Sequence, residues 1–215
     1  MPCCCGQCAG IEAVFGERVA RWELARYRRR GARGTTKLLL ELLRAAGSPA
    51  GRTLLDIGGG IGAIQHELAA AGIAAITSVD ASPAYLAVQR AEAERRGYAA
   101  QVRYLHGDFT ALAPEVEPHD IVTLDRVICC YHDMPALVGA SAARTRQLYG
   151  AVYPRRTWWT VAGVALINLA LRLRGTPFRT FVHPPAEIER ILAAAGLRPR
   201  AARRTVIWHV AVYTR

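Results

Sequence analysis

The residues best suited to chemistry in this chain are a glycine-rich turn and an acidic side chain that ends the next apolar segment. The turn, Asp56-Ile57-Gly58-Gly59-Gly60-Ile61-Gly62, follows the apolar run Thr53-Leu54-Leu55. Glycines let the backbone approach a ligand, and a helix that begins after them directs its N–H groups at that ligand. Asp80 and Ala81 end the next apolar segment, where a carboxylate can accept hydrogen bonds from both hydroxyls of a ribose. The pattern predicts a nucleotide-binding unit of strand, turn, helix and strand.

Two kinds of nucleotide ligand fit this unit. Gly58-x-Gly60-x-x-Ala63 matches the dinucleotide fingerprint, and Asp80 lies about 20 residues further on, as NAD(P) binding requires. Asp56 stands before the glycines, where it would repel a pyrophosphate but would suit a cationic ligand. The charge at this position favours a cationic ligand, and an NAD(P)-dependent oxidoreductase is the alternative.

The spacing Asp56-x-Gly58-x-Gly60-x-Gly62 resembles motif I of the class I S-adenosylmethionine-dependent methyltransferases. The resemblance implies that S-adenosylmethionine is the cofactor. The glycine turn would hold its amino-acid part, with Asp56 near the ammonium group. Asp80, next to Ala81, would accept hydrogen bonds from the ribose.

A second motif points to the same family. His106-Gly107-Asp108-Phe109 follows the third predicted strand and resembles the methyltransferase motif in which an acidic side chain reads the adenine amino group. The resemblance implies that Asp108 contacts the adenine and that Phe109 packs on its ring.

The segment from Asp125 to His132 follows the fourth predicted strand and should border both cofactor and acceptor. Ligands of open sheets bind beyond the carboxyl ends of the strands. Asp125 and Arg126 are further candidate cofactor contacts. Tyr131 and His132 are the candidates for acceptor contact or general base, since imidazole titrates near neutral pH. The alternative for His132 is a helix N-terminal residue without a catalytic role.

An arginine cluster, Arg28-Arg29-Arg30 with Arg33, follows Tyr27. One interpretation is a solvated helix face. The other is a lid over the cofactor, in which Tyr27 caps the cofactor's carboxylate and an arginine meets an anionic acceptor.

The second half of the chain is similar to the magnesium-protoporphyrin O-methyltransferases. The similarity rests on Ala143-Arg144-Thr145-Arg146, on Tyr153-Pro154-Arg155-Arg156-Thr157 and on the apolar segment that follows. It implies O-methylation of a small, partly apolar or anionic molecule by direct in-line displacement. An ionised carboxylate needs little base in such a reaction. The N-terminus, with Cys3-Cys4-Cys5 and Tyr27-Arg28-Arg29-Arg30-Gly31, departs from that family.

Strands and helices that would position these residues alternate along the chain, which is typical of a doubly wound α/β fold. We expect strands at 53–57, 75–80, 102–106, 120–124 and 148–153, and a final strand at 203–213 that fits a closing antiparallel hairpin. Helices are expected at 63–71, from 83, at 134–145, at 158–173 and from 185 to 195. The family resemblance implies a mostly parallel seven-stranded sheet with helices on both faces. Residues 1–50 would form a cysteine-rich tail and an N-terminal helical cap, with Thr35 and Thr36 capping its second helix, and 51–215 the methyltransferase core.

The formal net charge is +11 at pH 7, but Lys37 is the only lysine, so arginine carries nearly all of the positive charge. No nucleic-acid-binding module is recognisable, and we do not expect nucleic acid to be the substrate. An anionic substrate or weak contact with an anionic membrane surface accounts for the charge equally well. The apolar segment 158–173 is too short to span a membrane, and we expect it to be buried or to cover the substrate rather than to lie in a membrane interface.

Four cysteines gather at the N-terminus: Cys3, Cys4, Cys5 and Cys8. A thiol-rich tail is one interpretation, and no complete metal site is predicted, because no second pair of ligands follows at useful range. The alternative is a metal- or redox-sensing protein that retains the methyltransferase fold. The N-terminal residues lack a signal-peptide pattern, which predicts a cytoplasmic protein.

Overall fold

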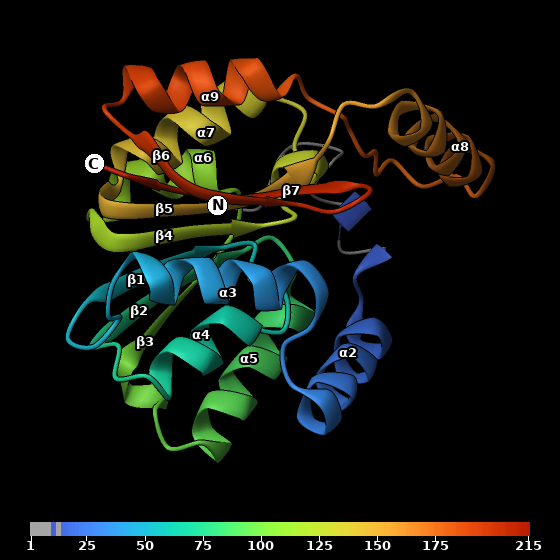
Figure 1. The fold of residues 1–215 in the computed structure, drawn as a ribbon. Coiled ribbons are helices and arrows are strands. Elements are labelled where there is room, and N and C mark those ends of the chain that lie inside the picture. The colour runs from blue at the N-terminus through green and yellow to red at the C-terminus, as the bar shows by residue number, and fades with distance from the viewer. Residues whose placement is uncertain (1–9, 12–13) are drawn as a thin grey trace.

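The structure, a computed structural model, describes residues 10–11 and 14–215. Its centre is a seven-stranded sheet made of β1 (Thr53–Ile57), β2 (Ala75–Asp80), β3 (Val102–His106), β4 (His119–Asp125), β5 (Thr145–Pro154), β6 (Arg198–Arg204) and β7 (Trp208–Thr214). The order across the sheet is β3-β2-β1-β4-β5-β7-β6 (Figure 1). Strands β1 to β5 run parallel, and β7 is antiparallel to both of its neighbours. The predicted doubly wound sheet with a C-terminal antiparallel strand is confirmed.

Helices cover both faces of this sheet (Figure 1). One face carries α3 (Gly34–Ala46), α4 (Ala63–Ala69) and α5 (Pro83–Arg95); the other carries α6 (Phe109–Leu112), α7 (Met134–Ala143) and α9 (Pro185–Ala194). Successive strand residues point to opposite faces, so Leu54 and Leu55 enter two different buried clusters. Two helices lie outside these layers: α2 (Glu17–Arg30), beside α5, and α8 (Trp158–Leu173), which projects from the body.

Helix α3 belongs to the core of the domain. Leu39 and Leu43 are buried among residues of β1, β5 and β7, and a Cβ added to Gly150 of β5 would meet Leu39 Cδ1 at 3.0 Å. The helix begins at Gly34, and Thr35 and Thr36 lie inside its first turn, so the prediction that they cap the helix is wrong. Helix α3 thus shares its buried cluster with the strands that follow residue 50. The division of the chain at residue 50 into a helical cap and a methyltransferase core stays a prediction.

The predicted closing antiparallel hairpin is confirmed, but a single strand over 203–213 is not, because β6 ends and β7 begins within this region. Thr205–Ile207 turn the chain back, and Thr205 Oγ1 accepts a hydrogen bond from Trp208 N at 2.9 Å. Val206 and Ile207 in the turn continue the apolar run of β7, which concealed the turn in the sequence. The helix predicted to end at residue 145 ends at Ala143, because β5 already begins at Thr145.

Helix α8 has the predicted bounds, but the expectation that it is buried is wrong. Thr160 is its only buried residue, and Leu173 is 82% exposed. The helix is held by its neighbouring return segment instead: the side-chain amide of Asn168 donates to Thr180 O at 2.8 Å and accepts from Thr180 N at 2.9 Å.

We expect the substitution Leu39→Ala to lower the free energy of unfolding by about 2–5 kcal/mol, because it leaves a cavity between α3 and the sheet. Urea unfolding measures this loss. Leu173→Ala is the matched control, with the same atoms removed from an exposed position, and it should change stability by less than about 0.5 kcal/mol. Equal, small effects of both substitutions would show that α3 is not part of the cooperative core.

Candidate functional site

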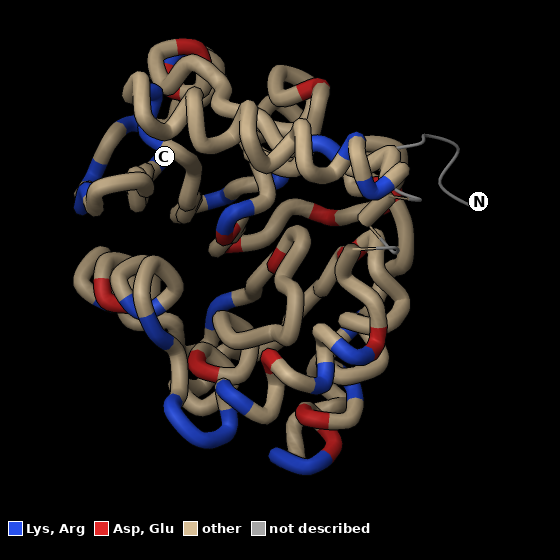
Figure 2. Tube along the Cα trace, turned by 90° about the vertical axis from the view of Figure 1, so that its right-hand side faces the viewer, with Lys and Arg blue, Asp and Glu red and all other residues tan. Residues whose placement is uncertain are grey.

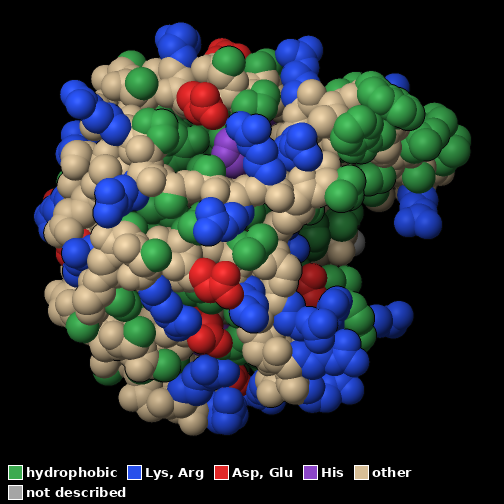
Figure 3. Space-filling view, in the orientation of Figure 1, with side chains coloured by type: hydrophobic (Ala, Val, Ile, Leu, Met, Phe, Trp, Pro, Cys, Tyr) green, Lys and Arg blue, Asp and Glu red, His purple; other side chains and the backbone are tan. Residues whose placement is uncertain are grey.

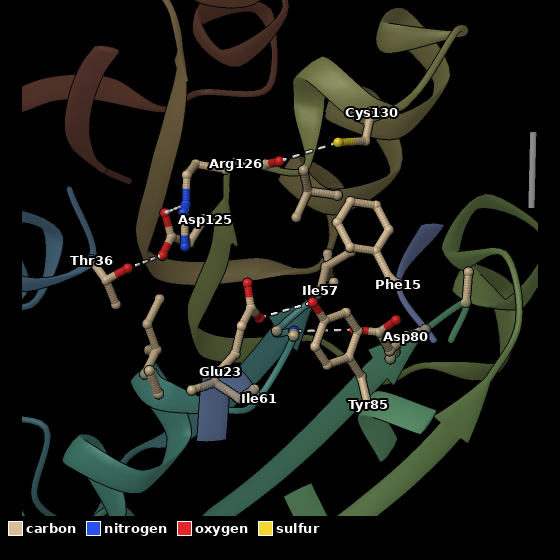
Figure 4. Close-up of a pocket in the computed structure, with 18 of the residues that line it drawn as sticks. Phe15, Glu23, Thr36, Ile57, Ile61, Asp80, Tyr85, Asp125, Arg126 and Cys130 are labelled. Carbon is tan, nitrogen blue, oxygen red and sulfur yellow. Dashed lines mark hydrogen bonds and ion pairs between the residues drawn. The ribbon is translucent and has the colours of Figure 1, made fainter. Parts of the chain in front are cut away.

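A cavity of about 510 Å³ opens at the carboxyl ends of β1, β2 and β4, beside α2 and the start of α3 (Figure 4). In the view toward the side of α2 and α8, acidic positions lie near the middle of the trace with Lys and Arg around them (Figure 2). The charged and hydroxyl-bearing lining residues of the cavity are Glu23, Arg26, Tyr27, Arg33, Thr36, Asp80, Tyr85, Asp108, Asp125, Arg126 and Tyr131.

The glycine turn forms one wall of the cavity. Gly58, Gly59 and Gly60 line it, whereas Gly62 lies at the N-cap of α4 outside the lining. Gly60 has a φ of +58°, and a Cβ added there would meet no protein atom within 4 Å. Its backbone conformation, rather than crowding by the protein, therefore favours glycine, and the space above it stays open to a ligand.

Asp80 lies at the end of β2 with both carboxylate oxygens held by backbone N–H groups. Gly60 N donates to Oδ2 at 3.1 Å and Ser82 N donates to Oδ1 at 2.8 Å (Figure 4). Burial raises the pKa of Asp80 to about 6, although the two backbone hydrogen bonds favour the charged form. Asp80 and the adjacent Ala81 line the cavity, as a ribose-binding position requires.

Asp56 lies behind the glycine turn and is not among the lining residues. Its Oδ1 accepts a hydrogen bond from Thr123 Oγ1 at 2.7 Å, and its buried Oδ2 has no hydrogen-bond partner. A Cβ added to Gly59 would lie 2.3 Å from Oδ2, so this carboxylate requires glycine above it. Burial raises the pKa of Asp56 to about 7.

Asp125 and Arg126, at the end of β4, line the cavity as predicted. Arg126 has a φ of +63°, and its Nε lies 3.3 Å from Asp125 Oδ1. Thr36 Oγ1 donates to Asp125 Oδ2 at 2.5 Å (Figure 4). Sequence reasoning missed this role of Thr36, because a threonine near a helix start is first interpreted as a cap.

Asp108 and Tyr131 meet at the cavity wall. The Tyr131 hydroxyl donates to Asp108 Oδ2 at 2.8 Å, and Thr110 N donates to Asp108 Oδ1 at 2.9 Å, so Asp108 also caps α6. Phe109 is buried and lines the cavity beside them.

His132, next to Tyr131 in the sequence, does not line the cavity. Its side chain is exposed and stacks on the ring of Tyr131. His183 Nε2 lies 2.9 Å from the carbonyl oxygen of Tyr131, which positions the backbone there. The structure thus brings Tyr131 to the cavity, and not His132.

Helix α2 contributes three side chains to the cavity wall. Tyr27 is buried, and its hydroxyl donates to Glu67 Oε1 at 3.0 Å. Glu23 lies one helical turn earlier and accepts a hydrogen bond from the hydroxyl of Tyr85 at 2.8 Å (Figure 4). The four-residue spacing from Tyr27 could have identified Glu23, because residues i and i+4 share a helix face. Arg26 is the third.

Arg28, from the arginine cluster, ties α2 to α5. Its Nη2 lies 2.7 Å from Glu92 Oε2, and Arg95 and Arg96 bind the same carboxylate at 2.6 and 2.7 Å. Hydrogen bonds from Arg95, Arg96 and Arg28 hold the pKa of Glu92 well below its usual range, although burial opposes this shift. Arg29 and Arg30 are exposed, as expected for a solvated face.

Within residues 10–11 and 14–215, no group of three or more metal-ligating side chains comes together. Cys129 and Cys130 line the cavity, with their sulfur atoms 3.8 Å apart. Cys3, Cys4, Cys5 and Cys8 lie outside the described residues.

The pKa of Asp56 gives a test of its burial. Because the folded protein holds this proton more tightly than the unfolded chain does, stability should fall as pH rises between about 4 and 7. The substitution Asp56→Asn removes this dependence, so wild type should lose about 2–3 kcal/mol relative to the variant between about pH 5 and about pH 8. Urea unfolding of both proteins at the two pH values measures the change. A stability difference independent of pH would contradict it.

Comparison with known proteins agrees with this geometry. A family described as "Methyltransferase domain" matches residues 54–147, which hold the glycine turn, Asp80 and Asp108. Magnesium protoporphyrin IX methyltransferase from Synechocystis, crystallised with bound S-adenosylhomocysteine, has a TM-score of 0.67 and 18% identity, over 95% of this chain and 99% of that one. No curated protein matches the chain.

Two further solved structures have the same fold. An O-methyltransferase family protein from Burkholderia thailandensis has a TM-score of 0.71 and 15% identity, over 95% of this chain and 62% of that one. An O-methyltransferase family 2 protein from Planctomyces limnophilus, in complex with apigenin, has a TM-score of 0.66 and 19% identity, over 91% of this chain and 61% of that one. Residues 54–147 of this chain therefore match a methyltransferase domain, and the chain has the class I methyltransferase fold.

Proposed function

We propose that the protein transfers the methyl group of S-adenosylmethionine to an oxygen atom of a small, partly apolar molecule. The observation that carries this proposal is the single cavity that joins the glycine turn, Asp80 and Asp108 to Tyr131 and to apolar walls. Two of the similar structures support it: one is named for magnesium protoporphyrin IX and one is a complex with apigenin.

The residues of the cavity fit the cofactor. Gly60 leaves open space where a side chain would stand, and Asp80 presents a buried carboxylate at the cavity wall. In the proposal Asp80 binds the ribose, Asp108 and Phe109 hold the adenine, and the glycine turn holds the amino-acid part. Asp125 and Arg126 are additional contacts. When bound, S-adenosylmethionine supplies a methyl group on a positively charged sulfur.

The chain's own contribution is to position the acceptor and to exclude water. Tyr131 is the candidate acceptor contact, because its hydroxyl lies at the cavity wall and is oriented by Asp108. Arg26, Arg33 and Arg126 also line the cavity and would attract an anionic acceptor. An acceptor carboxylate would arrive ionised and would need no general base.

Asp80→Ala should weaken binding of S-adenosylhomocysteine by about 1–3 kcal/mol, or about 5- to 150-fold, since two ribose hydroxyls lose their acceptor. Titration calorimetry measures the affinity. Glu94→Ala is the matched control, because it removes the same charge from the exposed face of α5, and its affinity should stay within about twofold of wild type. Equal affinities of all three proteins would refute the role of Asp80, and binding of NAD(P)H in place of S-adenosylhomocysteine would refute the cofactor assignment.

Oxygen as the methylated atom has its own test. The protein is incubated with S-adenosylmethionine and matched pairs of small aromatic molecules, each a carboxylic acid or phenol with its amide or amine counterpart. We expect release of S-adenosylhomocysteine and a product heavier by one methyl group from the oxygen acids. Turnover of the nitrogen compounds alone would overturn the O-methylation.

A further inference from the structure

Helix α8 turns its uncharged polar residues inward and its large apolar residues outward. Thr160 is buried, and Asn168 is half-buried and bonded to the return segment, whereas the exposed face carries Leu166, Leu169 and Leu173. Leu166 is 67% exposed and Leu173 is 82% exposed. Helices on a water-facing surface show the opposite pattern. Figure 3 shows the result as a continuous group of hydrophobic side chains on the part of the molecule that projects.

The charge around α8 has one sign. Residues 134–186 contain seven arginines and no aspartate or glutamate. Arg155 and Arg156 precede the helix, and Arg172 and Arg174 stand at its end. Two tryptophans, Trp158 and Trp159, begin it, and both are exposed. Tryptophan and arginine at the ends of an apolar helix suit the boundary between lipid headgroups and acyl chains.

The length of α8 excludes a crossing of the bilayer. Its 16 residues span about 24 Å, against a hydrocarbon thickness of about 30 Å. No helix in the described part of the chain is both long and apolar enough to span a membrane. A helix of this kind fits a lipid surface by lying along it.

A second copy of the chain fits this surface less well than a membrane does. Two copies packed through α8 would bring the arginines at the ends of both helices close together without an acidic side chain from residues 134–186 to pair with them. The net charge of +11 adds repulsion between the copies. Anionic headgroups instead supply the complementary charge.

We propose that α8 docks on the surface of an anionic lipid bilayer, with its apolar face among the acyl chains and its flanking arginines at the headgroups. The base of α8 is tied to the cavity wall, because Phe181 N and Thr180 Oγ1 both donate to Cys129 O, at 2.7 and 3.1 Å. Docking would therefore hold the cavity close to the lipid surface. Helix α2, whose Arg29 and Arg30 are exposed, lies on the same side of the molecule as α8 (Figure 1).

Sedimentation with vesicles tests the docking. We expect the wild-type protein to sediment with vesicles of phosphatidylcholine and phosphatidylglycerol, and at least about tenfold less with phosphatidylcholine alone. The double variant Leu166→Glu/Ile167→Glu should lose at least about tenfold in partitioning to the anionic vesicles, because two carboxylates face the acyl chains. Its binding of S-adenosylhomocysteine should match wild type, which shows that it is folded.

The matched control is Ala70→Glu/Ala74→Glu, which makes the same change of net charge at exposed positions near the amino end of β2, away from the cavity. It should keep its partitioning within about twofold of wild type. An equal loss of vesicle binding in both double variants would show that net charge alone causes the effect, and it would overturn a specific role of α8. Unchanged vesicle binding of Leu166→Glu/Ile167→Glu would overturn that role as well. A wild-type dimer in lipid-free sedimentation that this variant dissociates would assign α8 to a second copy of the chain instead.

Discussion

Asp80 accepts hydrogen bonds from two backbone N–H groups that belong to different loops, and the cavity depends on this carboxylate. Gly60 N comes from the turn after β1 and Ser82 N from the start of α5, so one side chain holds the two loops at a set distance. Ser82 Oγ then donates to Phe15 O at 3.0 Å, which joins the N-terminal segment to the same point. Burial opposes the ionised carboxylate, and the backbone donors offset part of that cost.

The residues before the nucleotide-binding unit complete the cavity wall. Thr36 of α3 donates to Asp125, and Glu23 of α2 accepts from Tyr85. These contacts join segments that lie far apart in the sequence. The helices α2 and α3 precede residues 54–147, which match the methyltransferase family, and they supply the wall that closes over the strand ends. The same helices differ in their packing, since α3 is buried on the sheet and α2 lies beside α5 (Figure 1).

Local patterns predicted most of the sheet and several of the residues that line the cavity at the strand ends. Glycine conformation, strand ends and the acidic residues Asp80 and Asp108 follow local rules, so their positions at one cavity were foreseeable. What failed depends on tertiary contacts. An alternating apolar pattern does not mark where the chain turns back at Thr205. The apolar composition of α8 does not reveal whether the helix is buried in the protein or exposed on its surface. Nor does proximity in sequence place His132 at the cavity beside Tyr131.

The cluster of three arginines on Glu92 bears on how a ligand leaves. Arg28 belongs to α2, which lines the cavity, while Glu92 belongs to α5 beneath it. A swing of α2 away from the cavity must break this ion pair together with the contacts of Tyr27 and Glu23 to the core. Such an opening would be an activated step whose barrier is partly electrostatic, so the residence time of a bound cofactor would shorten as ionic strength rises, even where the strand-end contacts stay unchanged.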